Sequence, residues 1–484
     1  MRQALSILAT LWLLGGFACK EPPAEEANKI PITTSSEEAL QDFLKGREAS
    51  ERLKDASQYY ETAIAKDPEF ALAHLFLGFA RLTTQNRSAH LEQAAALSDQ
   101  VSQGERLLIL GLNVGGTDPA EQGQYLEELV QAYPQDERAH LYLGDFYHWF
   151  RQDTERAVEE YKKAIEIAPE YPPTYNAMGY AYRELGKYEE AEQAFAEYIE
   201  LIPDEANPYD SYAELLMKLG RFDDSIKSYR KALSVDPEFT SSYIGIAANR
   251  MYQANYEEAR AELGKMSEQS KIDEERQFAL EQLVVTCVDE GDLEKALQVL
   301  DQHSALAEAT RDPTELANSV TLRGDVLSEM GRYDEALVEY EKATKLVESA
   351  DLLQGFKGLF MRGCRYRLSR LALMRDDLEQ ARAEADELLA DAESVTDLQG
   401  IQRAHEVKGM IALHEKDFEG AIPELEQTDP GDPYAMFQLA LAYQGKGNLE
   451  RTREYCEKVA NHNEIPTLRY ARVRKDALEM LEAM

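Results

Sequence analysis

The residues that could do chemistry in this sequence are spread out and form no recognisable motif. Eight histidines are scattered along the chain, and His405 and His414 are spaced too far apart to share a metal ion on one helix face. No glycine-rich phosphate loop, H-E-x-x-H zinc motif or G-x-S-x-G nucleophile elbow occurs. The sequence therefore predicts no catalytic residue, no metal site and no cofactor.

A run of arginines forms a local concentration of positive charge in an acidic chain. It consists of Arg362, Arg365, Arg367 and Arg370. These side chains could bind an anionic partner or a phosphate-bearing ligand, or they could pair with nearby Asp and Glu residues, as exposed charges readily do. The basic residues between Arg469 and Lys475 allow the same two interpretations.

Composition limits the class of protein more firmly than any single residue does. The 484 residues include 52 Lys and Arg against 90 Asp and Glu, a net charge of -38. Such a charge repels nucleic-acid phosphates and anionic lipids, so general nucleic-acid binding is excluded. With 44% hydrophobic residues, only 17 Pro and 27 Gly, the composition favours a soluble helical protein over an all-β one.

The N-terminus resembles a bacterial lipoprotein signal. Arg2 precedes a short apolar run, and Ala18-Cys19 follows. We expect residues 1–18 to be a signal peptide, Cys19 to be lipidated and residues 19–34 to form a disordered tether. Gly16 stands where such signals usually have Leu, so ordinary secretory cleavage and an uncleaved anchor stay open as alternatives.

The remaining cysteines carry little information about chemistry. Cys287, Cys364 and Cys456 are far apart in sequence and have no Cys or His partner at metal-binding spacing. We expect buried free thiols, although a Cys287–Cys364 disulfide is possible in an oxidising compartment.

A repeated unit organises most of the chain. Pro169, Pro203 and Pro237 are spaced by 34 residues, and the two segments between them align without gaps. The first aligned segment reads Tyr175-x2-Met178-Gly179-x2-Tyr182, followed by Ala191-x3-Phe195, and each proline is placed to end a second helix. This pattern resembles the tetratricopeptide repeat, a 34-residue helix–turn–helix unit.

The resemblance implies an all-α, right-handed superhelical solenoid. It covers residues 35–272 as a regular block and 273–484 as a degenerate block, with spacings nearer 40 residues, for about eleven or twelve units in all. Small residues such as Gly179 would let paired helices approach closely. A capping box Ser35-x-x-Glu38 would start the first helix, and a capping helix after Pro466 would end the array.

The resemblance also implies a concave groove that holds an extended peptide or a helix of a partner. The repeat register places eight residues in it: Asp145, Trp149, Asn176, Tyr180, Arg183, Asp210, Glu214 and Lys218. Mixed aromatic, arginine and acidic groups suit peptide recognition, although they could equally be ordinary solvated residues.

These observations predict a non-catalytic protein–protein interaction scaffold or adaptor exported to the bacterial cell envelope. It would face the periplasm or the cell surface and touch the membrane only through the anchor at Cys19. One alternative is a binder of glycans or small ligands that uses Trp149, Tyr180 and Tyr252. A weaker one is an enzyme whose site lies within residues 273–465, which would require a cleft of unpaired, pKa-shifted groups.

Overall fold

The computed structural model describes residues 28–80, 84–113 and 118–484. Within these ranges the chain is helical and contains no strand. The helices are α1 (Glu37–Glu51), α2 (Ser57–Lys66), α3 (Ala71–Gly78), α4 (Thr84–Leu97), α5 (Gln103–Leu112), α6 (Pro119–Ala132), α7 (Glu137–Asp145), α8 (Thr154–Ile167), α9 (Pro172–Glu184), α10 (Tyr188–Leu201), α11 (Asn207–Lys218), α12 (Phe222–Val235), α13 (Ser241–Tyr252), α14 (Tyr256–Gln269), α15 (Asp273–Glu290), α16 (Leu293–Thr310), α17 (Pro313–Glu329), α18 (Tyr333–Ser349), α19 (Gln354–Met374), α20 (Leu378–Ser394), α21 (Leu398–His414), α22 (Phe418–Leu425), α23 (Pro433–Gly445), α24 (Leu449–Ala460) and α25 (Leu468–Glu482).

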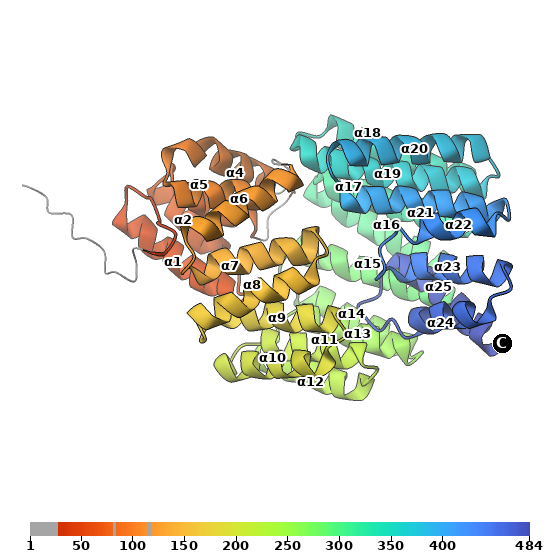
Figure 1. Ribbon diagram of the computed structural model, residues 1–484, viewed down its shortest axis with the longest axis horizontal. Helices are drawn as coiled ribbons and strands as arrows, with labels where there is room; N and C mark the ends of the chain where they lie inside the picture. The colour runs from red at the N-terminus through yellow and green to blue at the C-terminus, as the bar shows by residue number, and fades with distance from the viewer. Residues whose placement is uncertain (1–27, 81–83, 114–117) are drawn as a thin grey trace, which may run out of the picture.

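Consecutive helices pack in pairs, from α1 with α2 to α23 with α24, and each pair packs on the next. The described helices thus form a continuous array that curves through the red, yellow, green and blue segments of Figure 1. This arrangement confirms the predicted all-α solenoid. α14 and α15 pack directly on each other, so the stacking continues across residue 272.

The prolines and the aromatic residues after them define each pair. Helices α8, α10 and α12 end two residues before a proline, as the sequence predicted. The first-helix side chain six positions after that proline then donates to its carbonyl oxygen. The hydroxyl contacts are Tyr175 to Pro169 (2.9 Å), Tyr209 to Pro203 (3.0 Å) and Tyr243 to Pro237 (3.3 Å).

Glycines in first helices let second helices approach closely. A Cβ atom on Gly179 would lie 2.6 Å from the ring of Phe195, and one on Gly324 would lie 2.5 Å from the ring of Tyr340. Both contacts lie within one helix pair. The Phe195 ring therefore fills the space between the two helices of its own pair. No side chain larger than that of glycine fits at position 179 without moving the ring.

Longer helices run from α15 to α21. α15 to α21 contain 17 to 21 residues each, whereas α8 to α14 contain 12 to 14. The extra turns account for the repeat spacing that drifts from 34 towards 40 residues after residue 272.

The expected disordered tether is wrong for residues 28–34. Ile30 N donates to Asp136 at 2.8 Å, Thr33 N donates to Glu105 at 2.6 Å, and Thr34 Oγ1 donates to Asp67 at 2.5 Å. This extended segment crosses the ends of successive helix pairs and supplies donors to their carboxylates. Residues 19–27, and the signal peptide with Cys19, lie outside the described residues.

The start of the first helix also differs from the prediction by one residue. Ser36, not Ser35, is the N-cap of α1, and its side chain accepts a hydrogen bond from Ala39 N at 3.2 Å. Ser35 instead uses its backbone N–H to bind Asp67. The extended segment before α1 therefore sets where the helix begins.

The final helix does more than the capping role predicted for it. α25 packs on α23 and α24 at the end of the array, and also on α15, which precedes it by almost two hundred residues (Figure 1). Arg472 of α25 forms an ion pair with Glu329 of α17. The C-terminus thus ties the end of the array to its middle.

Three cysteines lie within the described residues, and all are buried free thiols, namely Cys287, Cys364 and Cys456. The possible Cys287–Cys364 disulfide is therefore absent. No helix among the described residues combines the length and apolar character that crossing a bilayer requires.

The close helix contacts predict opposite effects for two glycine substitutions. Gly179→Ala should destabilise the protein by about 1 to 3 kcal/mol, because its new methyl group would overlap the Phe195 ring. Gly264→Ala, in α14 with open space at its Cβ position, should stabilise it by about 0.5 to 1 kcal/mol. Urea unfolding of both variants measures this difference, and equal stabilities would contradict the packing argument.

Candidate functional site

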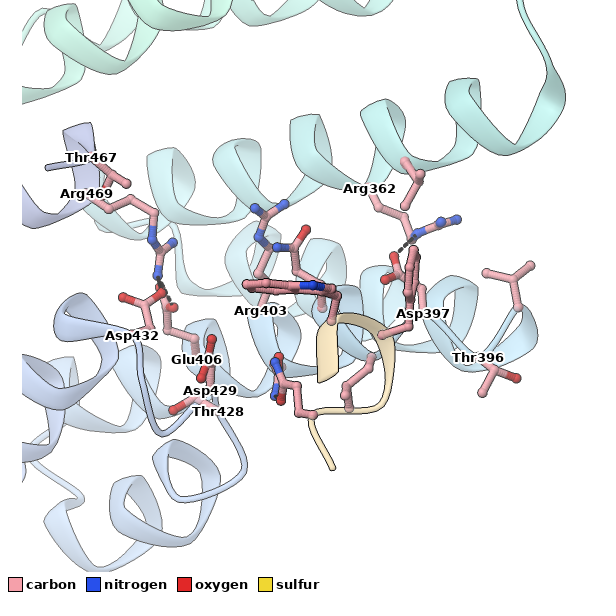
Figure 2. Close-up of a pocket in the computed structure, with 18 of the residues that line it drawn as sticks. Arg362, Thr396, Asp397, Arg403, Glu406, Thr428, Asp429, Asp432, Thr467 and Arg469 are labelled. Atoms are coloured by element: carbon pink, nitrogen blue, oxygen red, sulfur yellow. Dashed lines mark hydrogen bonds and ion pairs between the residues drawn. The ribbon is translucent and has the colours of Figure 1, made fainter. Parts of the chain in front are cut away.

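A cavity of about 930 Å³ lies where the curve of the array brings distant helices together. One wall comes from the N-terminal half, around α6 and the π-helical turn Phe146–Phe150 that follows α7. The opposite wall comes from α19, α21 and the segments around α23 and α25. Figure 2 shows labelled side chains of the second wall, with a short yellow turn of the first wall beside them.

The cavity gathers exposed apolar side chains. Five of the large hydrophobic residues with substantial exposure line it: Trp149 (60%), Phe150 (43%), Leu359 (42%), Val395 (37%) and Leu398 (36%). Apolar groups left in contact with water and concentrated in one concavity are typical of a binding site.

Local structure holds Trp149 in this exposed position. The π-helical turn changes the direction of the side chains after α7, and such turns are common at functional sites. The indole stacks on the buried His148 ring at a centroid distance of 4.1 Å. His148 Nε2 is fixed in turn by Glu184 Oε2 at 2.7 Å.

Arg403 supplies an unpaired positive charge to the same cavity. Among the described residues it has no carboxylate within ion-pair distance, and its guanidinium lies 5.6 Å from the centre of the Tyr366 ring. Burial lowers the pKa of Arg403, and the like charge of Arg469 adds to this effect. A carboxylate brought into the cavity would therefore find a partially desolvated cation.

The neighbouring charged groups already have partners. Arg469 binds Glu406 at 2.6 Å and Asp432 at 2.5 Å, and Arg362 binds Asp397 at 2.6 Å. In Figure 2, Arg403 lies between these two groups. The cavity thus combines satisfied ion pairs at its edges with one cation left available between them.

Of the eight predicted groove residues, the structure places one, Trp149, in this cavity. Asp145 accepts a hydrogen bond from Tyr161 at 2.8 Å, and burial raises its pKa to about 6. Asp210 accepts one from Ser242 at 2.5 Å, and burial together with Glu214 raises its pKa to about 8. These carboxylates hold neighbouring helices together and do not face a free groove.

The other predicted groove residues also contact the chain itself. Tyr180 packs edge-on against Phe195 and donates to Ser211 at 3.3 Å, and Arg183 pairs with Glu214 at 3.1 Å. Asn176 is partly buried nearby, and its Oδ1 lacks a hydrogen-bond partner.

The C-terminal segment of the chain occupies the inner face beside α11 and α13. Lys218 binds Glu464 at 2.6 Å, and the buried Tyr252 donates its hydroxyl to the Glu464 carbonyl oxygen. Arg474 stacks over the Tyr252 ring, with its guanidinium carbon 5.1 Å from the ring centre. This part of the predicted groove is therefore filled by residues 462–474 of the same chain.

The arginine run is largely used in internal contacts. Arg362 binds Asp397, Arg365 binds Glu387 at 2.8 Å, and Arg367 binds Asp325 at 3.1 Å. Arg370 donates to the Tyr434 hydroxyl at 2.9 Å. Of the two interpretations of this run, pairing with neighbours is the one the contacts show.

Sequence reasoning missed most of the cavity. Arg403, Leu359, Val395 and Leu398 come from helices far in sequence from Trp149, and no spacing rule joins them. The only signal in the sequence was the presence of these large apolar residues. That they are exposed to solvent becomes visible only in the folded array.

Comparisons with known proteins identify the repeat. Family models described as tetratricopeptide repeat match residues 123–172, 160–193, 206–239, 275–349, 366–435 and 434–463, which together span more than half of the chain. No curated protein matches the sequence.

Several solved structures are similar to parts of the array. MamA is 21% identical over 35% of this chain and 95% of its own, with a TM-score of 0.30. The pilus biogenesis factor PilW is 19% identical over 45% and 96%, with a TM-score of 0.33. Cut9 in its complex with Hcn1 is 14% identical over 89% and 79%, with a TM-score of 0.39.

The ion pairs around Glu464 predict a pH-dependent contribution to stability. Burial opposes ionisation, but the positive charges of Lys218, Arg183 and His462 outweigh it and lower the pKa of Glu464 from 4.5 to about 2. Glu464→Gln should therefore cost about 1 kcal/mol at pH 7, a value reduced because the side chain is partly open to solvent.

The pKa of Glu464 is lower in the folded protein than in the unfolded chain. The stability that its ion pairs contribute is therefore fully present above about pH 4.5 and disappears as the pH falls towards 2. Urea unfolding of the wild type and of Glu464→Gln at pH 7 and pH 3 measures it. A stability difference that grows on acidification would contradict the assignment.

Proposed function

The chain belongs to the tetratricopeptide repeat family, and from this premise we propose that it is a non-catalytic protein-interaction scaffold whose binding site is the central cavity. The observation that carries the proposal is the set of five exposed apolar side chains that line one cavity next to an unpaired arginine. Repeat arrays of this kind use extended concave surfaces for recognition.

The cavity chemistry specifies the kind of partner. Its volume is that of a site for a few side chains and not for a folded domain. Trp149 and its apolar neighbours would receive one or two hydrophobic side chains, and Arg403 would receive a carboxylate. We therefore propose an extended peptide or short helix with apolar residues next to an acidic group.

The glycan alternative has less support from the geometry. Trp149 remains exposed, but Tyr252 is buried beneath the C-terminal segment and Tyr180 is engaged with Phe195. Stacked sugar rings would need several such aromatic faces open together.

The enzyme alternative would need unpaired reactive groups in the cavity. Glu406, Asp432 and Asp397 are each held by an arginine. These pairs give structural roles to three of the lining carboxylates, which favours binding over catalysis there. Asp429 also lines the cavity, and burial raises its pKa, but its Oδ1 accepts a hydrogen bond from Gly431 N at 2.8 Å.

A peptide-binding experiment tests the cavity assignment. A displayed peptide library selected on the purified protein should yield apolar sequences that contain Asp, Glu or a free C-terminus. Trp149→Ala should weaken the selected peptides at least tenfold, because a central aromatic anchor is lost, and Arg403→Gln should weaken the acidic ones similarly. Fluorescence anisotropy of labelled peptides gives the dissociation constants.

Leu449→Ala is the matched control for that experiment. Leu449 is 62% exposed on α24 and does not line the cavity, so its loss should leave peptide affinity unchanged. Equal weakening by Leu449→Ala, or unchanged affinity in Trp149→Ala, would show that the peptides bind elsewhere.

We further propose that the protein is exported to the bacterial cell envelope and anchored there through a lipid on Cys19. The support is the signal-like segment before Cys19 in the sequence. Residues 28–34 then run along the ends of the first helix pairs, which would bring the array close to the membrane surface.

Mass spectrometry of the membrane fraction tests the anchor. The mature protein should begin at Cys19 and carry acyl chains, and Cys19→Ser should release it into the soluble fraction because a lipid anchor is its only membrane contact. Cys456→Ser, which alters a buried cysteine, should leave both the lipid and the membrane fraction unchanged. An unmodified N-terminus at residue 19 would overturn the proposal.

A further inference from the structure

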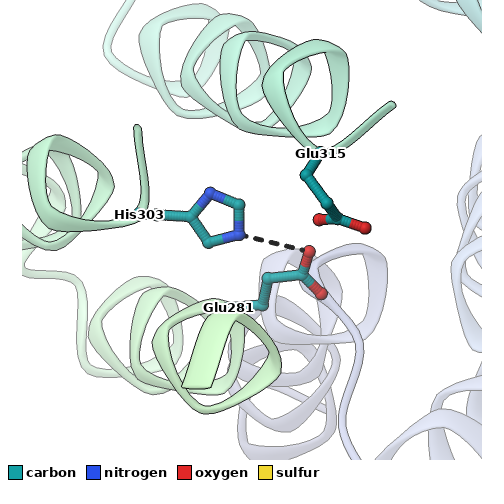
Figure 3. A group of neighbouring side chains, drawn as sticks. All are labelled: Glu281, His303 and Glu315. Atoms are coloured by element: carbon teal, nitrogen blue, oxygen red, sulfur yellow. Dashed lines mark ion pairs between the residues drawn. The ribbon is translucent and has the colours of Figure 1, made fainter. Parts of the chain in front are cut away.

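A second group of side chains lies outside the cavity, where three consecutive helices meet. Glu281 of α15, His303 of α16 and Glu315 of α17 converge in Figure 3, with one ligand-type atom from each lying within 4.8 Å of the others. Neither the repeat pattern nor the proposed binding function accounts for these residues.

His303 is the unusual member of this group. Its side chain is fully buried, yet neither ring nitrogen makes a hydrogen bond among the described residues. Nε2 points towards Glu281, 3.5 Å from its Oε1, which is too far for a strong hydrogen bond (Figure 3). Buried polar atoms normally have partners, so the ring nitrogens indicate a missing ligand.

Other histidines of the chain show what a satisfied ring looks like. His140 is also buried beside a glutamate, but its Nδ1 lies 2.7 Å from Glu160 and its Nε2 lies 3.2 Å from the Pro134 carbonyl oxygen. His303 is also buried beside a glutamate, Glu281, and has a second glutamate, Glu315, nearby. Neither of its ring nitrogens makes a hydrogen bond of the kind that His140 makes.

Glu315 lies near other carboxylates and forms no ion pair with a Lys or Arg among the residues that the structure describes. Burial, together with the charges of Glu281 and Asp312, raises the pKa of Glu315 to about 7. The Gln277 amide, with its nitrogen turned towards Glu315, donates to Oε2 at 3.0 Å and holds the carboxylate in place. Such an orienting hydrogen bond is typical of the residues behind a metal ligand.

We propose that Glu281, His303 and Glu315 bind one divalent transition-metal ion, with Zn²⁺ as the best fit. One imidazole and two carboxylates form a ligand set that Zn²⁺ accepts, and water would complete a tetrahedral site. Ligand atoms around such an ion lie about 3.4 Å apart, so the two partly exposed glutamates need only small rotations.

The proposed ion would join three helices from two successive pairs. It would neutralise the carboxylates and give the buried imidazole a partner, and both effects would stabilise this section of the array. Glu281, which is 28% exposed, provides the path by which an ion can enter.

Calorimetric titration of the chelator-treated full-length protein with Zn²⁺ tests the site. The wild type should bind one ion tightly and show a higher melting temperature with Zn²⁺ than without. Glu281→Gln, at a partly exposed position, should weaken this binding at least tenfold and abolish the shift in melting temperature. His303→Gln should do the same while keeping a side chain of similar size.

Two control variants separate this site from general binding to an acidic chain. Glu308→Gln removes an exposed carboxylate from the same helix as His303, and His140→Gln removes a buried histidine beside a glutamate. Both should bind Zn²⁺ as the wild type does. Unchanged binding in Glu281→Gln and His303→Gln, or no tight binding by the wild type, would overturn the proposal.

Discussion

The whole architecture depends on the close approach of paired helices at small residues. Where a glycine such as Gly179 or Gly324 faces an aromatic ring, the helix axes come nearer than any larger residue would allow. This contact sets the spacing of the two helices within a pair, and the pairs then stack on one another with a small rotation at each step. Because the rotations accumulate, the array curves until helices far apart in sequence face each other, and the cavity is the space left between them.

The C-terminal segment then determines which part of the inner face stays open. Glu464 and Tyr470 lie against helices of the middle pairs, and Arg469 and Arg472 bind carboxylates of α21 and α17. These buried charges would be costly without partners, so each ion pair specifies one position for the segment. The inner face beside α11 and α13 is closed by the chain itself, whereas the face around Trp149 is left uncovered.

The sequence predicted the fold well because the fold is local. Pro169, Gly179 and Phe195 act within one helix pair, and a period of 34 residues makes such local rules visible. The surroundings of the predicted groove residues depend instead on long-range contacts. Whether Lys218 faces solvent or Glu464 is decided by contacts across more than two hundred residues, and no periodicity records those contacts. The cluster of Glu281, His303 and Glu315 could not be predicted from the sequence either, because its three residues lie on three different helices.

The distribution of charge explains how so acidic a chain can recognise an acidic group. A net charge of -38 repels anions at long range, but salt screens that repulsion beyond about 10 Å. Inside the cavity the local balance differs, because the single charge of Arg469 offsets part of the negative charge of Glu406 and Asp432, and Arg403 adds a second cation that has no ion-pair partner among the described residues. A carboxylate that reaches Arg403 is attracted in a partly desolvated setting, where one short-range ion pair outweighs the screened charge of the surface. Selectivity would then come from the apolar side chains that must accompany that carboxylate, since only they can cover Trp149.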